Sequence, residues 1–335
     1  MKKLILGQFF TKKNTWLTKP VINFIEKNTK KCKSIVDPFA GIGDLFTTIR
    51  ILFSDKQDFK YLGYDIDDKL GWTQNDSLLK IPKISKSFFV TNPPYLSKNS
   101  CKRNDFSDSY KKYFLKFKFT DLYMIALHQM IETGLPGIAI VPETIIKSTF
   151  PKDKINRIVI IEPNPFEDTE VPICVVCFNG SVKEKIKIYK NDKYIGKLEN
   201  LNKLLPKPDS LFLYDLRFND IRGKIAIKGV DSTDPLNKIK FLNKEDLLYS
   251  ISKIKNTSRA ITIVGCEIFK KCNQNQINKI IKEANTILHN FRAATNDVLL
   301  APFKGNNKKA ERRRRLDFHT ARNILEIAYS NVISR

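Results

Sequence analysis

Short apolar segments alternate with amphipathic helical patterns over the first 180 residues, and this alternation restricts the chain to few folds. Apolar runs of strand length, each bounded by turn residues, lie at 34–36, 61–64, 87–91, 137–141 and 157–161. Residues 45–53 and 122–130 carry apolar side chains at helical spacing. Alternating strands and helices predict an α/β fold with a doubly wound, mostly parallel sheet, which binds its ligands at the carboxyl ends of the strands.

The pattern changes after Gly180, where Asn-rich and Lys-rich segments begin. Short strands are predicted within 183–189 and 224–230, followed by a polar helix around 276–290 and a dense basic run. We therefore predict two domains, residues 1–182 and residues 183–335, of which the second is a C-terminal α+β domain.

The charge of the chain favours a polyanionic partner. Its 335 residues include 59 Lys and Arg against 35 Asp and Glu, a net charge of +24. A large positive field attracts nucleic acid. No apolar run reaches the roughly 18 residues of a membrane span, so no membrane partner is expected. Six cysteines in a chain of this length argue against a disulfide framework and predict a cytoplasmic protein.

The first motif that carries chemistry is the segment 37–44, DPFAGIGD, between a strand and a helix. Gly41 and Gly43 allow a sharp turn and a close approach of a ligand. The motif is one glycine short of G-x-G-x-x-G, and Asp37 would repel a pyrophosphate while attracting the cationic amino group of a methionine-like ligand. Asp65, 22 residues past Gly43 at the end of the second strand, suits hydrogen bonds to ribose hydroxyls.

The second motif is Asn92-Pro93-Pro94-Tyr95 at the end of a strand. An aromatic amine such as adenine N6 is a poor nucleophile because its lone pair is delocalised into the ring. The Asn92 amide oxygen and the Pro93 carbonyl could each accept one N–H of that amine and expose the lone pair to a sulfonium methyl. The two prolines stiffen the turn and lack competing N–H donors. Tyr95 would stack on the base.

Together these motifs resemble those of the DNA amino-methyltransferases that act on adenine N6, in the group whose cofactor motif precedes the catalytic motif. The resemblance covers residues 7 to about 180. It includes the segment GQFFT at 7–11, NDS at 75–77 and NPFEDT at 164–169. It implies a Rossmann-like methyltransferase fold for residues 1–182 and S-adenosyl-L-methionine as the cofactor. The implied cofactor-binding residues are Gln8, Phe10, Thr11, Asp37, Phe39, Gly41, Gly43, Asp65, Ile66, Asp76 and Ser77.

The resemblance also implies how the substrate is reached. The target adenine must rotate out of the duplex, which costs a few kcal/mol of stacking and pairing. Stacking on aromatic side chains contributes about 1–3 kcal/mol per base, so Tyr95 and Phe166 on the faces of the base could offset much of that cost. Asn92, Pro93, Pro94, Tyr95 and Phe166 are the implied catalytic residues. No metal and no strong general base is implied, because positioning does most of the work.

Target recognition is expected downstream, because the roughly 50 residues between Gly43 and Asn92 are too few to hold a recognition domain. Two basic segments suit DNA contact: 98–118 and 304–315 each carry seven Lys or Arg. Arg312 to Arg315 are expected on a helix and mainly against phosphates. The candidate DNA-binding residues are Lys98, Lys102, Arg103, Arg217, Arg222, Lys304, Arg312, Arg313, Arg314 and Arg315.

The sequence is thus interpreted as a site-specific adenine-N6 methyltransferase of double-stranded DNA, the modification enzyme of a type II restriction–modification system. Its restriction endonuclease would act on the same site without a stable complex. An RNA adenine methyltransferase is an alternative, although the ribosomal adenine dimethylases usually have one proline in the catalytic motif. A protein glutamine methyltransferase is disfavoured by the charge of +24. A regulator without catalysis is disfavoured by the intact Asp65, Asp76 and Asn92.

Overall fold

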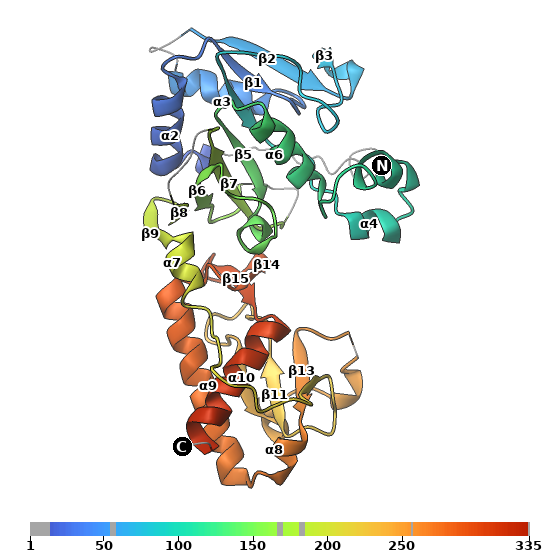
Figure 1. Cartoon of the computed structure of the whole chain (residues 1–335), viewed down its shortest axis with the longest axis vertical. Coiled ribbons are helices and arrows are strands. Elements are labelled where there is room, and N and C mark those ends of the chain that lie inside the picture. Colours follow the sequence, from blue (N-terminus) through green and yellow to red (C-terminus); the bar gives the residue numbers. More distant parts are fainter. Residues whose placement is uncertain (1–13, 54–57, 166–169, 181–184, 256, 334–335) are drawn as a thin grey trace. The chain divides into compact units, whose positions relative to one another are not determined.

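The computed structural model describes residues 14–53, 58–165, 170–180, 185–255 and 257–333. The predicted cofactor contacts Gln8, Phe10 and Thr11 and the predicted base contact Phe166 lie outside these ranges. The chain divides into two compact units, Met1–Leu198 and Glu199–Arg335 (Figure 1).

A nine-stranded sheet forms the first unit, in the order β3-β2-β1-β4-β5-β7-β6-β8-β9. Its strands are β1 (Ser34–Asp37), β2 (Lys60–Asp65), β3 (Thr73–Gln74), β4 (Ser87–Thr91), β5 (Gly137–Pro142), β6 (Ile155–Ile160), β7 (Ile173–Phe178), β8 (Lys187–Lys190) and β9 (Lys193–Lys197). The first five strands in the sheet order are parallel, and their order 3-2-1-4-5 is that of doubly wound folds. β7 runs antiparallel between β5 and β6. The predicted α/β class with a doubly wound, mostly parallel sheet is confirmed.

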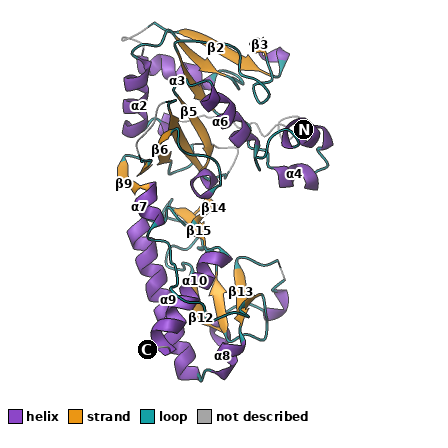
Figure 2. Ribbon diagram, in the orientation of Figure 1, coloured by secondary structure: helices purple, strands orange, loops and turns teal. Residues whose placement is uncertain are grey.

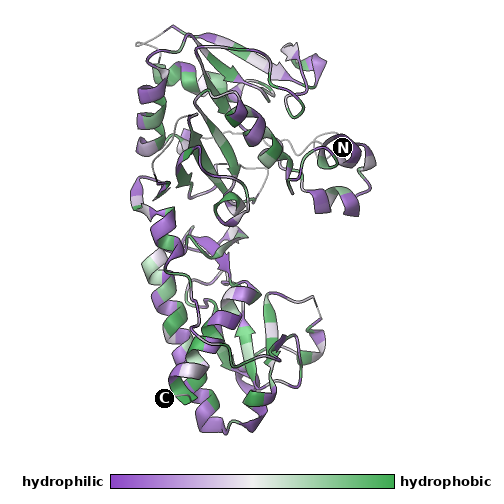
Figure 3. Ribbon diagram, viewed as in Figure 1, coloured by the Kyte–Doolittle hydropathy of each residue, from purple (hydrophilic) through white to green (hydrophobic). Residues whose placement is uncertain are grey.

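Helices cover the central strands of this sheet on both sides. Figure 2 shows α2 (Lys19–Thr29) and α3 (Asp44–Phe53) on one side and α6 (Leu122–Glu132) on the other. Apolar side chains of α2 and α3 pack with those of β1, β4, β5 and β7 in one buried cluster. Figure 3 shows the central strands of the sheet in green, the colour of hydrophobic residues. The short helices are η1 (Asn14–Trp16), η2 (Asp68–Leu70), α4 (Lys98–Arg103), α5 (Ser107–Ser109), η3 (Tyr110–Phe114) and η4 (Glu143–Lys147).

The first unit extends to Leu198 and not to residue 182 as predicted. β8 pairs parallel with β6, and β9 pairs antiparallel with β8, so both strands belong to the large sheet. These edge strands are rich in lysine and bury little of their surface. Charged side chains are common on sheet edges, so these strands lack the apolar runs from which the sequence predicts membership of a sheet.

The second unit is an α+β domain. Its sheet is antiparallel in the order β10-β13-β11-β12, and a hairpin of β14 and β15 stands beside it. The strands are β10 (Arg217–Phe218), β11 (Ile225–Lys228), β12 (Lys240–Asn243), β13 (Ile261–Gly265), β14 (Ala301–Asn306) and β15 (Arg312–Arg315). The helices are α7 (Leu198–Asn202), η5 (Lys244–Asp246), η6 (Ile251–Lys253), α8 (Glu267–Lys271), α9 (Gln274–Thr295) and α10 (Phe318–Ile333).

The predicted polar helix is α9, which begins at a capping box formed by Asn273 and Gln276. Its apolar stripe is buried, and the helix packs against α10 and β12. Across the described ranges, none of the helices has the length and apolar character needed to cross a membrane.

A buried ion-pair network holds the second unit together. The carboxylate of Asp231 accepts two hydrogen bonds from the guanidinium of Arg292, both at 2.9 Å, and further bonds from the backbone N–H groups of Ile239 and Arg314. Arg292 also pairs with Asp297 at 2.8 Å. These two carboxylates raise the pKa of the guanidinium above its ordinary value despite burial. The network ties α9 to the segment after β11 and to β15.

We expect Arg292→Met to destabilise the second unit by about 3–5 kcal/mol, because it leaves Asp231 buried without its cation. Chemical denaturation followed by circular dichroism measures this loss. The matched control is Arg222→Met, which removes an exposed guanidinium from its pair with Asp220 and should change the stability far less, because solvent screens such a pair. Equal stabilities of the two variants would contradict the role given to the network.

Candidate active site

The turn between β1 and α3 contains two glycines in the left-handed region. Gly41 has φ +52° and Gly43 has φ +87°, conformations that side chains with a Cβ rarely adopt. The Gly41 N–H donates to the Oδ2 atom of Asp65 at 2.9 Å. The Ala40 N–H donates to the Tyr64 carbonyl at 2.9 Å. The turn is therefore fixed to the end of β2 by two hydrogen bonds.

Asp65 is buried at the carboxyl end of β2, where the prediction placed it. Its Oδ1 atom accepts from the Asp67 N–H at 3.0 Å, and its Oδ2 atom accepts from Gly41. A carboxylate oxygen has two acceptor sites, so each oxygen retains capacity for a hydroxyl donor. Ile66, the next residue, is 36% exposed and lies beside this carboxylate in the chain.

Trp72 braces the glycine turn, a role that the sequence did not suggest. Its indole Nε1–H donates to the Gly41 carbonyl at 2.8 Å. A Cβ placed on Gly63 would lie 2.4 Å from the indole, so only glycine fits at that position of β2. Phe46 of α3 packs edge-on against the same ring. A lone tryptophan in a loop gives no sequence signal for this contact.

The Asp37 carboxyl joins the ends of β1 and β4. It is 2% exposed, and its Oδ1 atom accepts from the Thr91 hydroxyl at 2.5 Å and from the Phe39 N–H at 3.0 Å. Burial raises the pKa of Asp37 to about 7, the two hydrogen bonds oppose the rise, and the nearby Asp65 adds to it. A cation bound beside Asp37 would favour its ionised form.

Asn92 follows β4 at the same edge of the sheet and is half-buried. The Tyr95 hydroxyl lies 2.6 Å from Asn92 Oδ1 and 2.8 Å from the Ile140 carbonyl, and it can donate its one hydrogen to either. The Tyr95 ring is half-buried against the core and packs edge-on against Tyr123. Burial raises the pKa of Tyr95 well above its ordinary value, so the hydroxyl keeps its proton. Stacking of this ring on a base stays a prediction.

Pro93 and Pro94 continue the turn between Asn92 and Tyr95. Pro93 is buried and Pro94 is half-buried. Neither residue has a backbone N–H, so neither donates to the Asn92 oxygen. The structure thus brings together the whole Asn-Pro-Pro-Tyr motif and the Asp37 and Asp65 carboxylates at one edge of the sheet.

Asp76, the predicted contact to the cofactor's adenine, is bound by residues that the sequence analysis did not connect with it. Its Oδ2 atom pairs with Lys112 Nζ at 2.6 Å and accepts from the Tyr113 hydroxyl at 3.0 Å. Within the described part of the chain, Oδ1 has no partner. Ser77 is buried and its hydroxyl accepts from the Asn75 side chain. Phe39 packs in the same apolar cluster as Tyr113.

The basic segment 98–118 folds over this cluster and presents cations to solvent. The ammonium groups of Lys98 and Lys102 lie 5.6 Å and 5.5 Å from the centre of the Tyr110 ring. Lys102 and Arg103 are exposed on α4. The three predicted DNA contacts on this segment are therefore close neighbours on one short helix.

The predicted helix at Arg312 to Arg315 is wrong, because these residues form β15. Alternate side chains of a strand point to opposite faces, so Arg312 and Arg314 are 6% and 1% exposed and leave little surface for DNA. Arg313 donates to the Asp231 carbonyl at 2.8 Å and covers the Phe303 ring. Arg315 is half-buried and faces a pocket.

The other predicted DNA contacts of the second unit lie at its surface. Arg217 on β10 and Lys304 on β14 are exposed. Arg222 is exposed and paired with Asp220 at 3.2 Å, which raises the pKa of its guanidinium.

No family model and no curated protein matches the chain. Three similar solved structures are each 16% identical to it. A candidate class I S-adenosylmethionine-dependent methyltransferase from Listeria monocytogenes has a TM-score of 0.37 and matches 53% of this chain and 67% of its own. The type I restriction-modification methyltransferase subunit from Streptococcus thermophilus has a TM-score of 0.36 and matches 59% of this chain and 53% of its own. The type IIG restriction endonuclease BpuSI has a TM-score of 0.39 and matches 71% of this chain and 32% of its own.

We expect the stability of the protein to fall as the pH rises from 5 to 8, in part because Asp37 must ionise while buried. The pKa of Asp37 is about 7 in the folded chain and about 4 when unfolded, so its contribution is greatest at low pH and is lost as pH rises through 7. Asp37→Asn keeps the acceptor for Thr91 but cannot ionise, and should reduce this pH-dependent loss by about 2–3 kcal/mol.

Urea denaturation at pH 5 and pH 8 provides the comparison. Asp68→Asn removes the same charge from an exposed position on η2 and should keep the pH dependence of the parent. If Asp37→Asn keeps it as well, the pKa of Asp37 is not raised by folding and the carboxyl is already ionised in the folded chain at pH 5.

Proposed function

We propose that this chain is an S-adenosyl-L-methionine-dependent methyltransferase that modifies the N6 amino group of adenine in double-stranded DNA. The observation that carries the proposal is the meeting of Asp37, Asp65 and the Asn92 amide at one edge of the parallel sheet. Asp65 suits the ribose hydroxyls of the cofactor, and Asp37 suits its cationic amino group. The Asn92 amide beside them suits the aromatic amine of the substrate. We infer further that the chain is the modification enzyme of a type II restriction–modification system, in which a separate endonuclease acts on the same site.

The residues around the glycine turn fit this cofactor. Gly41 and Gly43 leave room at the turn, and Asp65 retains acceptor sites for ribose hydroxyls. Asp37 would face the cationic amino group. The Oδ1 atom of Asp76 is left as an acceptor for the adenine amine, because Lys112 and Tyr113 both bind Oδ2. When bound, the cofactor supplies an electrophilic methyl group on its sulfonium.

Asn92 and Pro93 would hold the acceptor amine. Two carbonyl oxygens that accept its two N–H bonds draw the nitrogen towards a tetrahedral shape and free its lone pair for attack. The Tyr95 hydroxyl, at 2.6 Å from Asn92 Oδ1, restricts the orientation of that oxygen before the substrate arrives. The amine loses its proton after the methyl transfer, so a strong base is unnecessary.

The partner follows from charge. A net charge of +24 and the exposed cations of α4 favour a polyanion over a compact protein substrate. Expression of the chain in cells without other methylases, followed by sequencing of a plasmid for modified adenines, tests the proposal and identifies the target site. Methylation of RNA in place of plasmid DNA would support the alternative substrate.

We expect Asn92→Ala to abolish methyl transfer while the affinity for the cofactor stays within a few-fold of the parent. The amide is proposed to hold the acceptor amine and not the cofactor. Transfer of labelled methyl groups to DNA and titration calorimetry measure the two quantities. Asn99→Ala, an exposed asparagine on α4, is the control. Turnover of Asn92→Ala above a tenth of the parent would refute the assignment.

We expect Asp65→Ala to weaken cofactor binding about 10- to 100-fold, since charge-assisted hydrogen bonds contribute about 1.5–3 kcal/mol each. Loss of the bond to Gly41 also loosens the turn. Calorimetry gives the affinity, with Asp67→Ala as a neighbouring control. An unchanged cofactor affinity in Asp65→Ala would mean that the Asp65 carboxylate does not bind the ribose hydroxyls of the cofactor.

A further inference from the structure

Three segments that are far apart in the sequence meet at Gly229 in the second unit. The Gly229 N–H donates to the Ala260 carbonyl at 2.7 Å, and the Leu316 N–H donates to the Gly229 carbonyl at 2.9 Å. A Cβ on Gly229 would lie 2.7 Å from the Arg259 carbonyl, so a larger residue would disturb this junction. The junction holds Arg259 and Arg315 on neighbouring segments.

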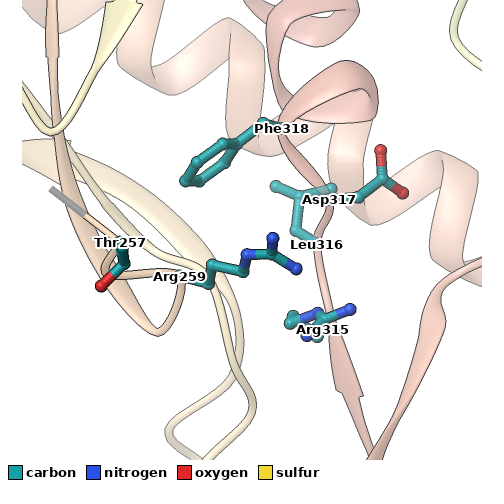
Figure 4. Close-up of a pocket in the computed structure, with 6 residues that line it drawn as sticks. All are labelled: Thr257, Arg259, Arg315, Leu316, Asp317 and Phe318. Carbon is teal, nitrogen blue, oxygen red and sulfur yellow. The ribbon is translucent and has the colours of Figure 1, made fainter. Parts of the chain in front are cut away.

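These two arginines line a pocket of about 420 Å³ together with Thr257, Leu316, Asp317 and Phe318 (Figure 4). This volume lies within the range of about 300–1,000 Å³ that is usual for small-ligand sites. Arg259 is exposed and Arg315 is half-buried. Among the described residues, neither guanidinium has an acid or a hydrogen-bond acceptor as partner.

The one acid of the pocket is occupied elsewhere. The Asp317 carboxylate caps α10 by accepting from the Thr320 N–H at 2.9 Å and from the Thr320 hydroxyl at 3.0 Å. Figure 4 shows it directed away from both arginines. Among the described residues, the two like charges of Arg259 and Arg315 therefore share one pocket without a counterion, an arrangement that an anion would stabilise.

An aromatic surface borders the same pocket. The rings of Phe318 and Phe218 are stacked, with centres 4.1 Å apart and planes 2° from parallel. Both residues are half-buried, and Phe318 lines the pocket. Stacking of one face on Phe218 fixes the ring in place, so a flat ligand would meet a rigid platform.

Further cations surround the neighbouring strand end. Burial lowers the pKa of Lys228, and the positive charges of Lys240 and Arg313 lower it further, while Asp231 and Asp234 oppose the shift. Lys228 ends β11, directly before Gly229. Lys228, Lys240 and Arg313 therefore lie close enough to interact at the strand end that leads into the junction.

We propose that this pocket binds one nucleotide of the DNA substrate, with the phosphate between Arg259 and Arg315 and the base against Phe318. Guanidinium groups match the geometry of phosphate oxygens, and two of them can donate hydrogen bonds to the two free oxygens of one phosphodiester. A base offers the flat ring that the Phe318 platform suits. The proposal rests on the proposed function, since it takes DNA as the partner, and it adds a nucleotide-binding site that includes Arg259 and Phe318.

Anisotropy of a labelled 20-base-pair duplex, titrated with the full-length protein at several salt concentrations, tests the site. Arg259→Ala and Arg315→Ala should each weaken binding about tenfold. The slope of log K against log salt should fall by up to about 0.9 when both arginines are replaced, because they share one phosphate contact. Arg→Lys at either position should bind with intermediate affinity, because it keeps the charge and loses the planar fork. Phe318→Leu should weaken binding about fivefold or more.

Lys282→Ala is the matched control, because it removes one positive charge from an exposed position of α9 in the same unit. It should change neither affinity nor slope. All variants should unfold at the temperature of the parent and keep its affinity for S-adenosyl-L-methionine, which excludes misfolding. The site is refuted if both arginine variants bind as the parent does, or if Lys282→Ala loses as much.

Methyl transfer by the parent protein separates this proposal from the proposed function. If the parent methylates DNA and the arginine variants bind like it, the function stands and the site fails. If the parent binds DNA through these arginines but transfers no methyl group, the site stands and the function fails. A parent that binds no duplex at low salt refutes both.

Discussion

The parallel pairing of β1 with β2 on one side and with β4 on the other is the constraint on which the candidate active site depends. Parallel strands end at the same edge of a sheet, so residues distant in the sequence meet there. The pairing brings the turn after Asp37 to Asp65, and it brings Thr91 within 2.5 Å of the Asp37 carboxyl. A shift of the pairing register by one residue in either strand would turn these side chains to the opposite face of the sheet and separate the residues of the site.

This edge concentrates polar groups that are unfavourable for folding alone. Asp37 and Asp65 are both buried, and the charge of Asp65 raises the pKa of Asp37. Hydrogen bonds from Gly41, Phe39 and Thr91 offset part of the cost of burial. A raised pKa such as that of Asp37, at an edge where parallel strands end, is typical of a ligand-binding site. A cation bound beside Asp37 would stabilise the ionised form of its carboxyl.

The sequence predicted those parts whose signal is local. The strands at 34–36, 61–64 and 87–91 are short apolar runs, and the polar residues that follow them had to lie at the sheet edge. The contacts of Trp72 with Gly41 and of Lys112 with Asp76 depend on the tertiary fold, so no local pattern predicts them. The lysine-rich strands β8 and β9 lacked an apolar run, which moved the predicted boundary. Four consecutive arginines have no periodicity, so their sequence could not distinguish a strand from a helix.

The arginines of the second unit show why net charge alone does not locate a DNA surface. Arg292 is committed to Asp231 and Asp297, and Arg313 is bonded to the Asp231 carbonyl, so these cations hold the fold together. Each still counts towards the total of +24. A cation is available to a ligand only where the fold leaves it without a partner and near the surface. Within the described ranges Arg259 and Arg315 meet that condition in one pocket, although the first stands outside both basic segments of the sequence.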